Sequence, residues 1–292
     1  IRAMDGRAPP QKKNAVLTID GIDYVDDKDK AEQFAKTYRR FSKLPALKSD
    51  RPLRKKNRKL GKRPLGTDES EMPLTMEELN RAIGQAGNCR VPGDDRIPYE
   101  LIKNLGPKAR EHLLHLFNLC WSGNGLPGNW LTAIIKPQQK EGKDPKLPES
   151  YRPISLLSCM GKLLEKVIAD RLLHVLEKGN LLNECQAGFR PGRTTTDQIL
   201  KFVQEASDQL HTEEKSRRLI TTFFDYEKAF DKVWRDGLIH KLHQLNVPPR
   251  FIRYVRSFLA GRKTRVEVNG TRSDQFFLKQ GLPQGSSIFP IL

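Results

Sequence analysis

The clearest hydrophobic pattern in the chain lies between Gly161 and Gly179. The apolar positions within it are three or four residues apart: Leu164, Val167, Ile168, Leu172, Val175 and Leu176. This spacing places the side chains on one face of a helix, and a glycine just past the last apolar residue is typical of a helix C-terminus. The segment is therefore predicted to be a helix with one buried face.

The same spacing predicts helices in most other parts of the chain. Thr75 and Glu78 stand at the separation of a capping box, which marks the start of one of them. The remaining helices are expected to start at Asp27, to follow a turn within 91–106, and to cover 107–121, 197–210, 236–245 and 248–261.

Strands are predicted where apolar or alternating runs are short. AVLTIDGIDYV (15–25) and RVEVNGTRSDQFFL (265–278) each contain an Asp-Gly or Asn-Gly turn typical of a hairpin. WLTAIIKP (130–137), YRPISLL (151–157) and RLITTFF (218–224) are expected to be single strands, and the last of them ends at Asp225. Helices mixed with hairpins and single strands indicate an α+β fold.

Residues 43–73 show neither the spacing of a helix nor the alternation of a strand. They are rich in Pro, Lys and Arg, and 51–63 contains eight basic residues and no acidic one. This composition predicts a flexible basic linker.

Charge changes the functional picture more than any other compositional feature. The 292 residues carry a formal net charge of +17. A globular chain this basic usually meets a polyanion, nucleic acid first and an anionic membrane surface second, and a solvated basic surface is the simpler alternative. The basic residues are clustered, which favours a nucleic acid. No apolar run approaches the length of a membrane span, and the four cysteines form no CxxC pair of the kind that binds zinc.

Asp225 is the first candidate for a metal-binding residue. A carboxylate at the end of a buried strand is costly unless it is paired or holds a metal, and its hard oxygen donors favour Mg²⁺ beside phosphates. The alternative is that Asp225 caps a helix formed by EKAFDKVW (227–234).

Two further segments contain candidate ligand-binding residues. Arg152 precedes a proline in SYRPISLL, and a guanidinium held there would meet a phosphate in bidentate fashion, unless it forms a surface ion pair. In GLPQGSS (281–287), two glycines and a proline surround Gln284 and permit a close approach of the backbone to a ligand, although any turn has this composition.

Four segments together resemble the reverse transcriptases of non-LTR (LINE-like) retrotransposons. They occur in the family's order and at similar intervals: YRPISLLSCMGKLLEKVIADRL (151–172), QAGFRPGRTTTDQI (186–199), FFDYEKAFDKVWRDGLIHKL (223–242) and GLPQGSSIFPIL (281–292). The resemblance covers roughly residues 70–292. It implies a right-hand polymerase fold, with fingers over 75–215 and an incomplete palm over 216–292, preceded by the hairpin, helix and linker of 1–74.

The resemblance also implies roles for individual residues. Asp225 and the carbonyl of Tyr226 match the first metal ligands of the palm, and Phe230 matches the aromatic residue that excludes a 2′-hydroxyl. Lys140 and Arg152 match fingers residues that contact the triphosphate, and Gln284 matches a residue near the nucleotide and template. Arg190 is assigned either to template support or to structure. Basic residues after the palm helix are expected to follow the template–primer backbone or to form a solvated face: Arg262, Lys263 and Arg265.

The sequence also departs from the family pattern. Phe289 occupies a position that is usually small, and it is expected to disturb packing near the site. Asp231 has no metal role in the pattern and is interpreted as structural. The Asp-Asp pair that supplies the other metal ligands does not occur between residue 281 and Leu292, and both ends of the chain look cut.

The activity implied is RNA-templated DNA synthesis with two Mg²⁺ ions, an RNA template, a DNA primer and deoxynucleotides. The parent protein is expected in the nucleus or cytoplasm as a ribonucleoprotein. This chain alone is expected to be inactive, since only one metal carboxylate is present. The alternatives are a non-catalytic nucleic-acid-binding remnant or domesticated module, and a maturase-like intron protein.

Overall fold

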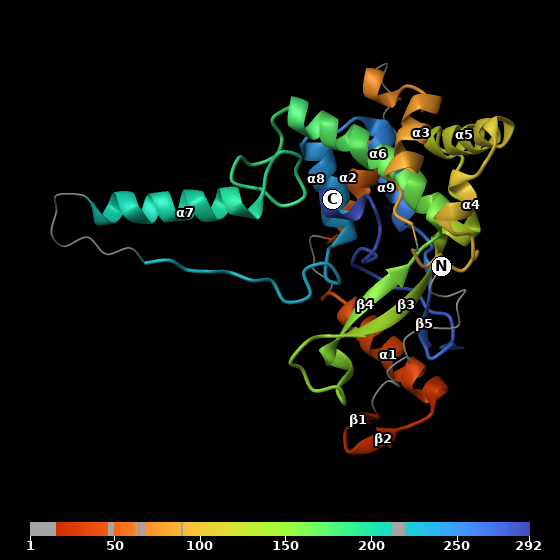
Figure 1. The fold of residues 1–292 in the computed structure, drawn as a ribbon, viewed down its shortest axis with the longest axis vertical. Helices are drawn as coiled ribbons and strands as arrows, with labels where there is room; N and C mark the ends of the chain where they lie inside the picture. The colour runs from red at the N-terminus through yellow and green to blue at the C-terminus, as the bar shows by residue number, and fades with distance from the viewer. Residues whose placement is uncertain (1–15, 46–49, 62–63, 65–67, 89, 212–219) are drawn as a thin grey trace.

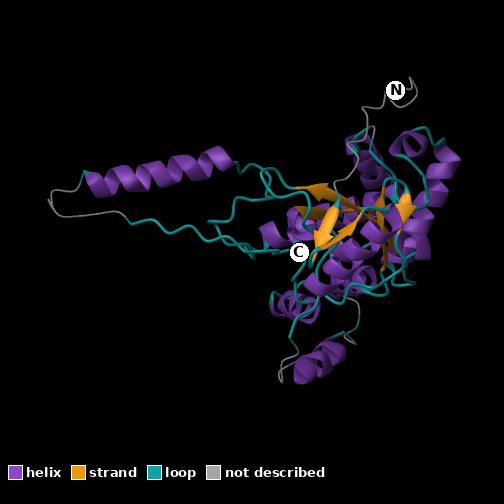
Figure 2. Ribbon diagram, turned by 90° about the horizontal axis from the view of Figure 1, so that it is seen from below, coloured by secondary structure: helices purple, strands orange, loops and turns teal. Residues whose placement is uncertain are grey.

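The computed structural model of the chain describes residues 16–45, 50–61, 64, 68–88, 90–211 and 220–292 (Figure 1). Helices and strands are mixed along the chain, which confirms the α+β class. Most elements gather into one body, and one helix projects away from it (Figures 1 and 2).

A four-stranded mixed sheet lies at the centre of the body. Its order is β4-β3-β5-β6, with bounds β3 Thr132–Gln139, β4 Tyr151–Leu156, β5 Lys263–Val268 and β6 Thr271–Arg272. β3 pairs antiparallel with β4, with Ile134 opposite Leu156, and parallel with β5, with Ile135 opposite Val266. The predicted Asn269-Gly270 turn joins β5 to β6, and both of its residues have positive φ, 48° and 88°.

Helix α1 (Asp27–Phe41) covers one face of this sheet. The side chain of Asp26 caps its first turn, and its predicted apolar face is buried. The Phe34 ring meets the Tyr151 ring of β4 edge-on, with centroids 4.9 Å apart. The predicted hairpin is also confirmed: β1 (Leu17–Ile19) and β2 (Ile22–Tyr24) are paired just before α1. Residues from the N-terminal part of the chain therefore share a core with the sheet, and the domain boundaries at 74 and 215 stay a prediction.

A second, larger core is mainly helical. The predicted helices form close to their expected bounds: α3 Met76–Gln85, α4 Tyr99–Lys103, α5 Pro107–Trp121, α6 Cys159–Lys178, α8 Arg235–Gln244 and α9 Pro249–Leu259. The Trp121 ring of α5 packs edge-on against Phe251 of α9, with centroids 5.0 Å apart. α6 lies in the middle of this group, and its apolar stripe is buried as predicted except at Val175, which is half-buried.

The prediction of a flexible linker over 43–73 is wrong for part of that range. Asp50–Leu60 forms helix α2, which packs on α8. Arg54 forms an ion pair of 2.7 Å with Asp236, and the Asn57 side-chain amide donates to the Asp236 carbonyl. These contacts join residues about 180 positions apart, so a pattern read locally could not reveal them. Residues 46–49, 62–63 and 65–67 lie outside the described part of the chain.

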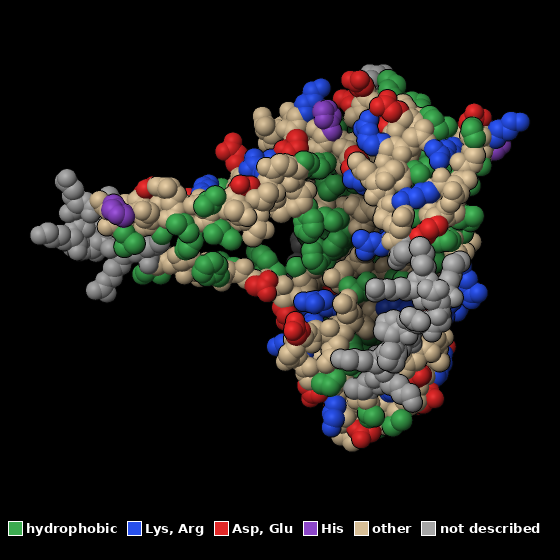
Figure 3. All heavy atoms as spheres, in the orientation of Figure 1, with side chains coloured by type: hydrophobic (Ala, Val, Ile, Leu, Met, Phe, Trp, Pro, Cys, Tyr) green, Lys and Arg blue, Asp and Glu red, His purple; other side chains and the backbone are tan. Residues whose placement is uncertain are grey.

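Helix α7 (Thr195–Leu210) projects from the body as an arm and has no buried residue. Hydrophobic side chains gather along this arm (Figure 3). Several are exposed although they repeat at helical spacing: Ile199, Leu200, Phe202 and Val203. The segment 220–226, which returns toward the body, is exposed as well. Within the described residues, no helix combines the length and apolar character that crossing a membrane requires.

Candidate active site

Asp225 and Tyr226 lie on an extended, exposed segment. The described residues 220–225 form no strand, so the prediction of a strand ending at Asp225 is wrong for them; Arg218 and Leu219 lie outside the described residues. The Phe224 and Tyr226 side chains are 87% and 83% exposed. An apolar run forms a strand only where a neighbour satisfies its backbone groups, and no described strand lies beside this segment.

The residues that follow form a tight turn instead of the helix that Asp225 was to cap. Residues 227–232 are turns, and Lys228 has a φ of 56°. The Lys228 ammonium group lies 3.6 Å from the centroid of the Phe41 ring, so the turn is held against the end of α1. This contact fixes the chain just beyond Asp225, while Asp225 itself remains exposed.

The turn is joined to the loop 281–287 by backbone hydrogen bonds. The Leu282 N–H donates to the Phe230 carbonyl at 3.0 Å, and the Gly281 N–H donates to the Val233 carbonyl at 2.9 Å. The Phe230 ring lies 4.3 Å, centroid to centroid, from the ring of Phe289, which is only 7% exposed. The bulky Phe289 therefore forms part of the packing between the two segments.

The loop 281–287 is also held from two other elements. The Ser155 N–H of β4 donates to the Gln284 carbonyl at 2.7 Å. On α6, the buried Glu165 carboxylate accepts from the Ser286 hydroxyl and from the Ser287 N–H at 2.5 and 2.8 Å. Gly285 has a φ of +122°, and a Cβ there would lie 2.5 Å from the Ser155 carbonyl oxygen. Glycine is therefore required by both conformation and space.

A small hollow lies beside this loop and brings Gln284 and Asp231 to its wall. Burial raises the pKa of the Asp231 carboxyl, and the charges of Lys228 and Lys140 partly oppose this effect. The Lys228 ammonium group, with a smaller effect from Lys140, lowers the pKa of Glu227.

Lys140 and Arg152 are placed by β3 and β4. The Lys140 ammonium group donates to the Glu149 carbonyl at 3.0 Å across the connection between these strands. Arg152 is exposed on β4 opposite Gln138 of β3. The turn and the loop thus bring Phe230 and Gln284 together, and Lys140 is held at the β3–β4 connection. Asp225 and Arg152 are exposed at the surface.

Comparisons with known proteins show the family of this chain. Residues 137–292 match the family model described as "Reverse transcriptase (RNA-dependent DNA polymerase)". The chain belongs to the reverse transcriptase family.

Its relatives are proteins of mobile elements. The chain is 34% identical over 220 residues to the "Probable RNA-directed DNA polymerase from transposon BS" of Drosophila melanogaster, covering 75% of this chain and 24% of that protein. The "RNA-directed DNA polymerase from mobile element jockey" of Drosophila funebris gives the same identity and coverage. The X-element polymerase of Drosophila melanogaster is 32% identical over 227 residues, 77% of this chain and 25% of that protein. The chain spans about a quarter of the length of these curated relatives.

The predicted metal ligands are the least complete part of the candidate site. Carboxylate and carbonyl oxygens such as those of Asp225 and Tyr226 are suited to Mg²⁺. Over the described ranges, no three acidic, histidine or cysteine side chains cluster in a way that would hold a cation. The donor type fits the ion, and the number of donors in the described part of the chain is small.

Two of the residues predicted to contact nucleic acid bind other residues of this chain. Arg190 forms an ion pair of 2.6 Å with Glu177 and donates to the carbonyls of Asn183 and Gln186, which fits the structural alternative. Arg262 is only 6% exposed and donates to the Phe258 carbonyl at 2.7 Å. A buried guanidinium in this position does not reach a phosphate at the surface.

Lys263 and Arg265 differ from Arg262. They alternate with the buried Thr264 and Val266 along β5, so both side chains lie on its exposed face. Their contact with a template–primer backbone stays a prediction.

Sequence reasoning missed Glu165 and Arg235. Arg235 donates to the Gly281 and Leu259 carbonyls, and burial lowers its pKa to about 10. Burial likewise raises the pKa of Glu165, while the charge of Arg262 and the bond from Ser286 partly oppose it. The sequence did contain a signal for Glu165. This acidic residue directly follows Leu164 in the apolar stripe of α6, and an acidic residue is rarely buried without a partner.

Proposed function

We propose that this chain supplies part of the active site of a non-LTR retrotransposon polymerase that copies RNA into DNA. The observation that carries the proposal is the junction of two motif segments. The turn 227–232 and the loop 281–287 are joined by the Leu282–Phe230 hydrogen bond, and Phe230 packs on Phe289. Family membership supports a nucleic-acid template and primer as partners, with deoxynucleotides as substrate.

In this proposal the residues around the junction bind and orient the nucleotide. Lys140 and Arg152 bind its phosphates, and Gln284 lies where the new base pair forms. Phe230 lies under the sugar and excludes a 2′-hydroxyl, which is the group that separates RNA precursors from DNA precursors. The contribution of these residues is mainly positioning and charge stabilisation of the phosphoryl group.

The Asp225 carboxylate and the Tyr226 carbonyl would hold Mg²⁺, which when bound supplies charge stabilisation at phosphoryl oxygens. Two ions require more carboxylates than Asp225 alone, and no Asp-Asp pair follows residue 281 in this sequence. We therefore propose that the 292-residue chain by itself does not synthesise DNA.

The net charge of +17 favours one second candidate, a non-catalytic nucleic-acid-binding module. A chimera separates the two candidates. Residues 137–292 replace the matching stretch of the jockey RNA-directed DNA polymerase, which supplies the rest of the domain. Primer extension is then measured on poly(rA)/oligo(dT) with Mg²⁺, for the chimera and for this chain alone.

The polymerase proposal expects synthesis by the chimera and none by the chain alone. A correctly folded chimera that binds the primer–template and adds no nucleotide favours the binding module. Synthesis by the 292-residue chain contradicts the proposed inactivity.

We further propose that the described body corresponds to fingers over 75–215 and an incomplete palm over 216–292. The support is positional: the match to the family begins on β3, and both candidate motifs after residue 216 meet at the turn–loop junction. We also propose that the parent protein acts in the nucleus or cytoplasm as a ribonucleoprotein.

A further inference from the structure

The small hollow beside the loop 281–287 also reaches the end of helix α1. Tyr38 of α1 and Ser42, which follows the helix, line it together with Asp231 of the turn. Its other walls come from β3, from β4 and from residues between 278 and 284. The N-terminal part of the chain therefore meets both motif segments around this hollow.

The Tyr38 hydroxyl is a buried donor that no described group satisfies. Tyr38 is only 3% exposed, and its hydroxyl has no hydrogen-bond partner among the described residues. Burial raises the pKa of this hydroxyl well above its usual value, and the charge of Asp231 adds to the effect. The hydroxyl therefore keeps its proton at neutral pH. Because a buried donor without an acceptor is costly, this group indicates a ligand in the hollow.

Asp231 places a carboxyl group on the wall of the same hollow. It lies close enough to Tyr38 for its charge to act on the hydroxyl, but the two groups form no direct hydrogen bond in the structure. Lys228 on its own turn and Lys140 after β3 favour the ionised carboxylate. Since the carboxylate accepts and the hydroxyl donates, a molecule with one acceptor and one donor would satisfy both.

The volume of the hollow selects water as that molecule. It is about 20 Å³, whereas a buried water needs about 10–15 Å³ and about two to four polar partners. Tyr38 and Asp231 are two such partners. The Ser42 hydroxyl can be a third, because it donates to the Arg39 carbonyl and accepts from the Lys279 N–H, which leaves one lone pair free. A phosphate, a sugar or a base is too large for this space.

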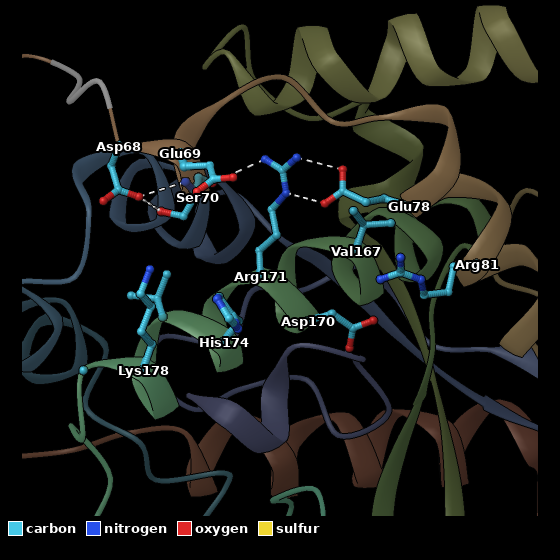
Figure 4. A pocket seen from close by; sticks show the side chains of 12 residues that line it. Asp68, Glu69, Ser70, Glu78, Arg81, Val167, Asp170, Arg171, His174 and Lys178 are labelled. Carbon is cyan, nitrogen blue, oxygen red and sulfur yellow. Dashed lines mark hydrogen bonds and ion pairs between the residues drawn. The ribbon is translucent and has the colours of Figure 1, made fainter.

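A much larger cavity between α3 and α6 lacks such a group (Figure 4). Its volume is about 700 Å³. The Arg171 guanidinium on its wall donates to both carboxylate oxygens of Glu78, and Asp68 accepts from the Ser70 N–H. Among the described residues that line it, none has a buried side-chain nitrogen or oxygen without a partner. Size alone therefore does not indicate a ligand, whereas the Tyr38 hydroxyl does.

We propose that one buried water molecule in this hollow joins the Tyr38 hydroxyl to the Asp231 carboxylate. The hydroxyl donates to the water oxygen, and the water donates to the carboxylate. Tyr38 is thereby a positioning residue for the turn 227–232, and it acts through Asp231. Tyr38 lies outside the residues 137–292 that match the family model, so the bridge makes α1 a part of the candidate site. The inference involves neither a nucleotide nor Mg²⁺ and is independent of the proposed function.

The first test measures the pKa of the Asp231 carboxyl by NMR in the 292-residue chain with isotope-labelled aspartate. The signal is assigned with Asp231→Asn. Tyr38→Phe removes the hydroxyl from the hollow. The matched control is Tyr151→Phe, because Tyr151 belongs to the same core and its hydroxyl donates to the Pro145 carbonyl at 2.8 Å instead. Thermal melts check that each variant folds.

Tyr38→Phe is expected to raise the pKa of Asp231 above its wild-type value, because the ionised carboxylate loses the water that is oriented toward it. Tyr151→Phe is expected to leave this pKa unchanged. An unchanged pKa in Tyr38→Phe, or an equal rise in both variants, would overturn the inference.

The second test detects the water itself. Deuteron relaxation dispersion of the solvent reports water molecules that stay bound to a protein for longer than it takes to tumble. Tyr38→Phe is expected to hold one such molecule fewer than the wild type, whereas Tyr151→Phe is expected to match the wild type. Asp231→Leu removes the acceptor and is expected to lose the same water, which keeps the test decisive if Tyr38→Phe does not fold. A rise in the pKa of Asp231 without the loss of a bound water would mean that the two side chains bond directly and that the water bridge is wrong.

Discussion

The two motif segments of this member of the reverse transcriptase family are supported very differently. The loop 281–287 is bound by β4 through Ser155, by α6 through Glu165 and by the turn through Phe230. The segment 220–226 carries the proposed metal ligand and is exposed along its whole length. A carboxylate must be held within fractions of an ångström to serve as a metal ligand. The loop proposed to position the nucleotide is therefore held by three elements, whereas the segment around Asp225 lacks such support.

The largest expected effect is on the anchor of the loop. Glu165→Ala removes the acceptor of Ser286 and Ser287 and leaves the buried Arg262 without its acid. Leaving a buried charge uncompensated costs about 3–5 kcal/mol of unfolding free energy. The urea midpoint is expected to fall accordingly. Glu165→Gln removes the same charge and keeps an acceptor for Ser286 and Ser287, so the part of the loss that it avoids measures the hydrogen bonds. An equal loss in both variants would show that the hydrogen bonds do not support the loop.

Two phenylalanine substitutions compare the packed end of the chain with the exposed segment 220–226 directly. Phe289→Ala empties a buried site against Phe230 and is expected to cost about 3 kcal/mol. Phe224→Ala changes an exposed ring and is expected to change stability by less than about 0.5 kcal/mol. Denaturant unfolding measures both. Similar losses would mean that the segment 220–226 is packed in solution.

Gly285→Ala tests how closely the loop approaches β4. The added Cβ meets the Ser155 carbonyl oxygen at a positive φ, which is expected to cost about 1–3 kcal/mol. Hydrogen exchange at the Ser155 amide should become faster, because its bond to Gln284 is strained. Gly188→Ala, where a Cβ meets nothing within 4 Å, is the control and is expected to leave this amide unchanged. Unchanged exchange in Gly285→Ala would place the loop away from β4.

The smallest expected effect concerns the pH dependence of stability. Burial raises the pKa of Asp231 in the folded chain, so the folded state binds more protons than the unfolded state between the ordinary and the raised value. The contribution of Asp231 to stability is therefore full below an ordinary Asp pKa of about 4, and it is lost as the pH rises through the folded pKa. Asp231→Asn is expected to remove this slope. Unfolding midpoints between pH 4 and 7 check it, and an unchanged slope would contradict the burial.

The sequence predicted the parts of this structure that depend on local patterns. α6 and the hairpin turn at Asn269-Gly270 follow from spacing and turn chemistry, which a short window contains. The order of four motif segments was enough to identify the family, because their intervals are kept.

Long-range contacts account for the failures. The run before Asp225 has the composition of a strand but no described neighbour to pair with, and α2 depends on Asp236 far along the chain. Glu165 and Arg262 have the residue types of a surface, yet tertiary packing buries both. For the same reason the sequence could indicate Lys140, Phe230 and Gln284, but not the contacts that hold their segments together.

The two aspartates of FFDYEKAFDKVW provide the most direct test of the central claim, which is that Asp225 is a metal ligand and Asp231 is structural. Asp225→Asn and Asp231→Asn are compared in the chimera with the jockey polymerase by single-nucleotide incorporation with Mg²⁺. The account predicts that Asp225→Asn lowers the rate by about a thousandfold or more, equivalent to about 4 kcal/mol, whereas Asp231→Asn stays within about tenfold of the unsubstituted chimera. Normal incorporation by Asp225→Asn, or an equal loss in both variants, would contradict it.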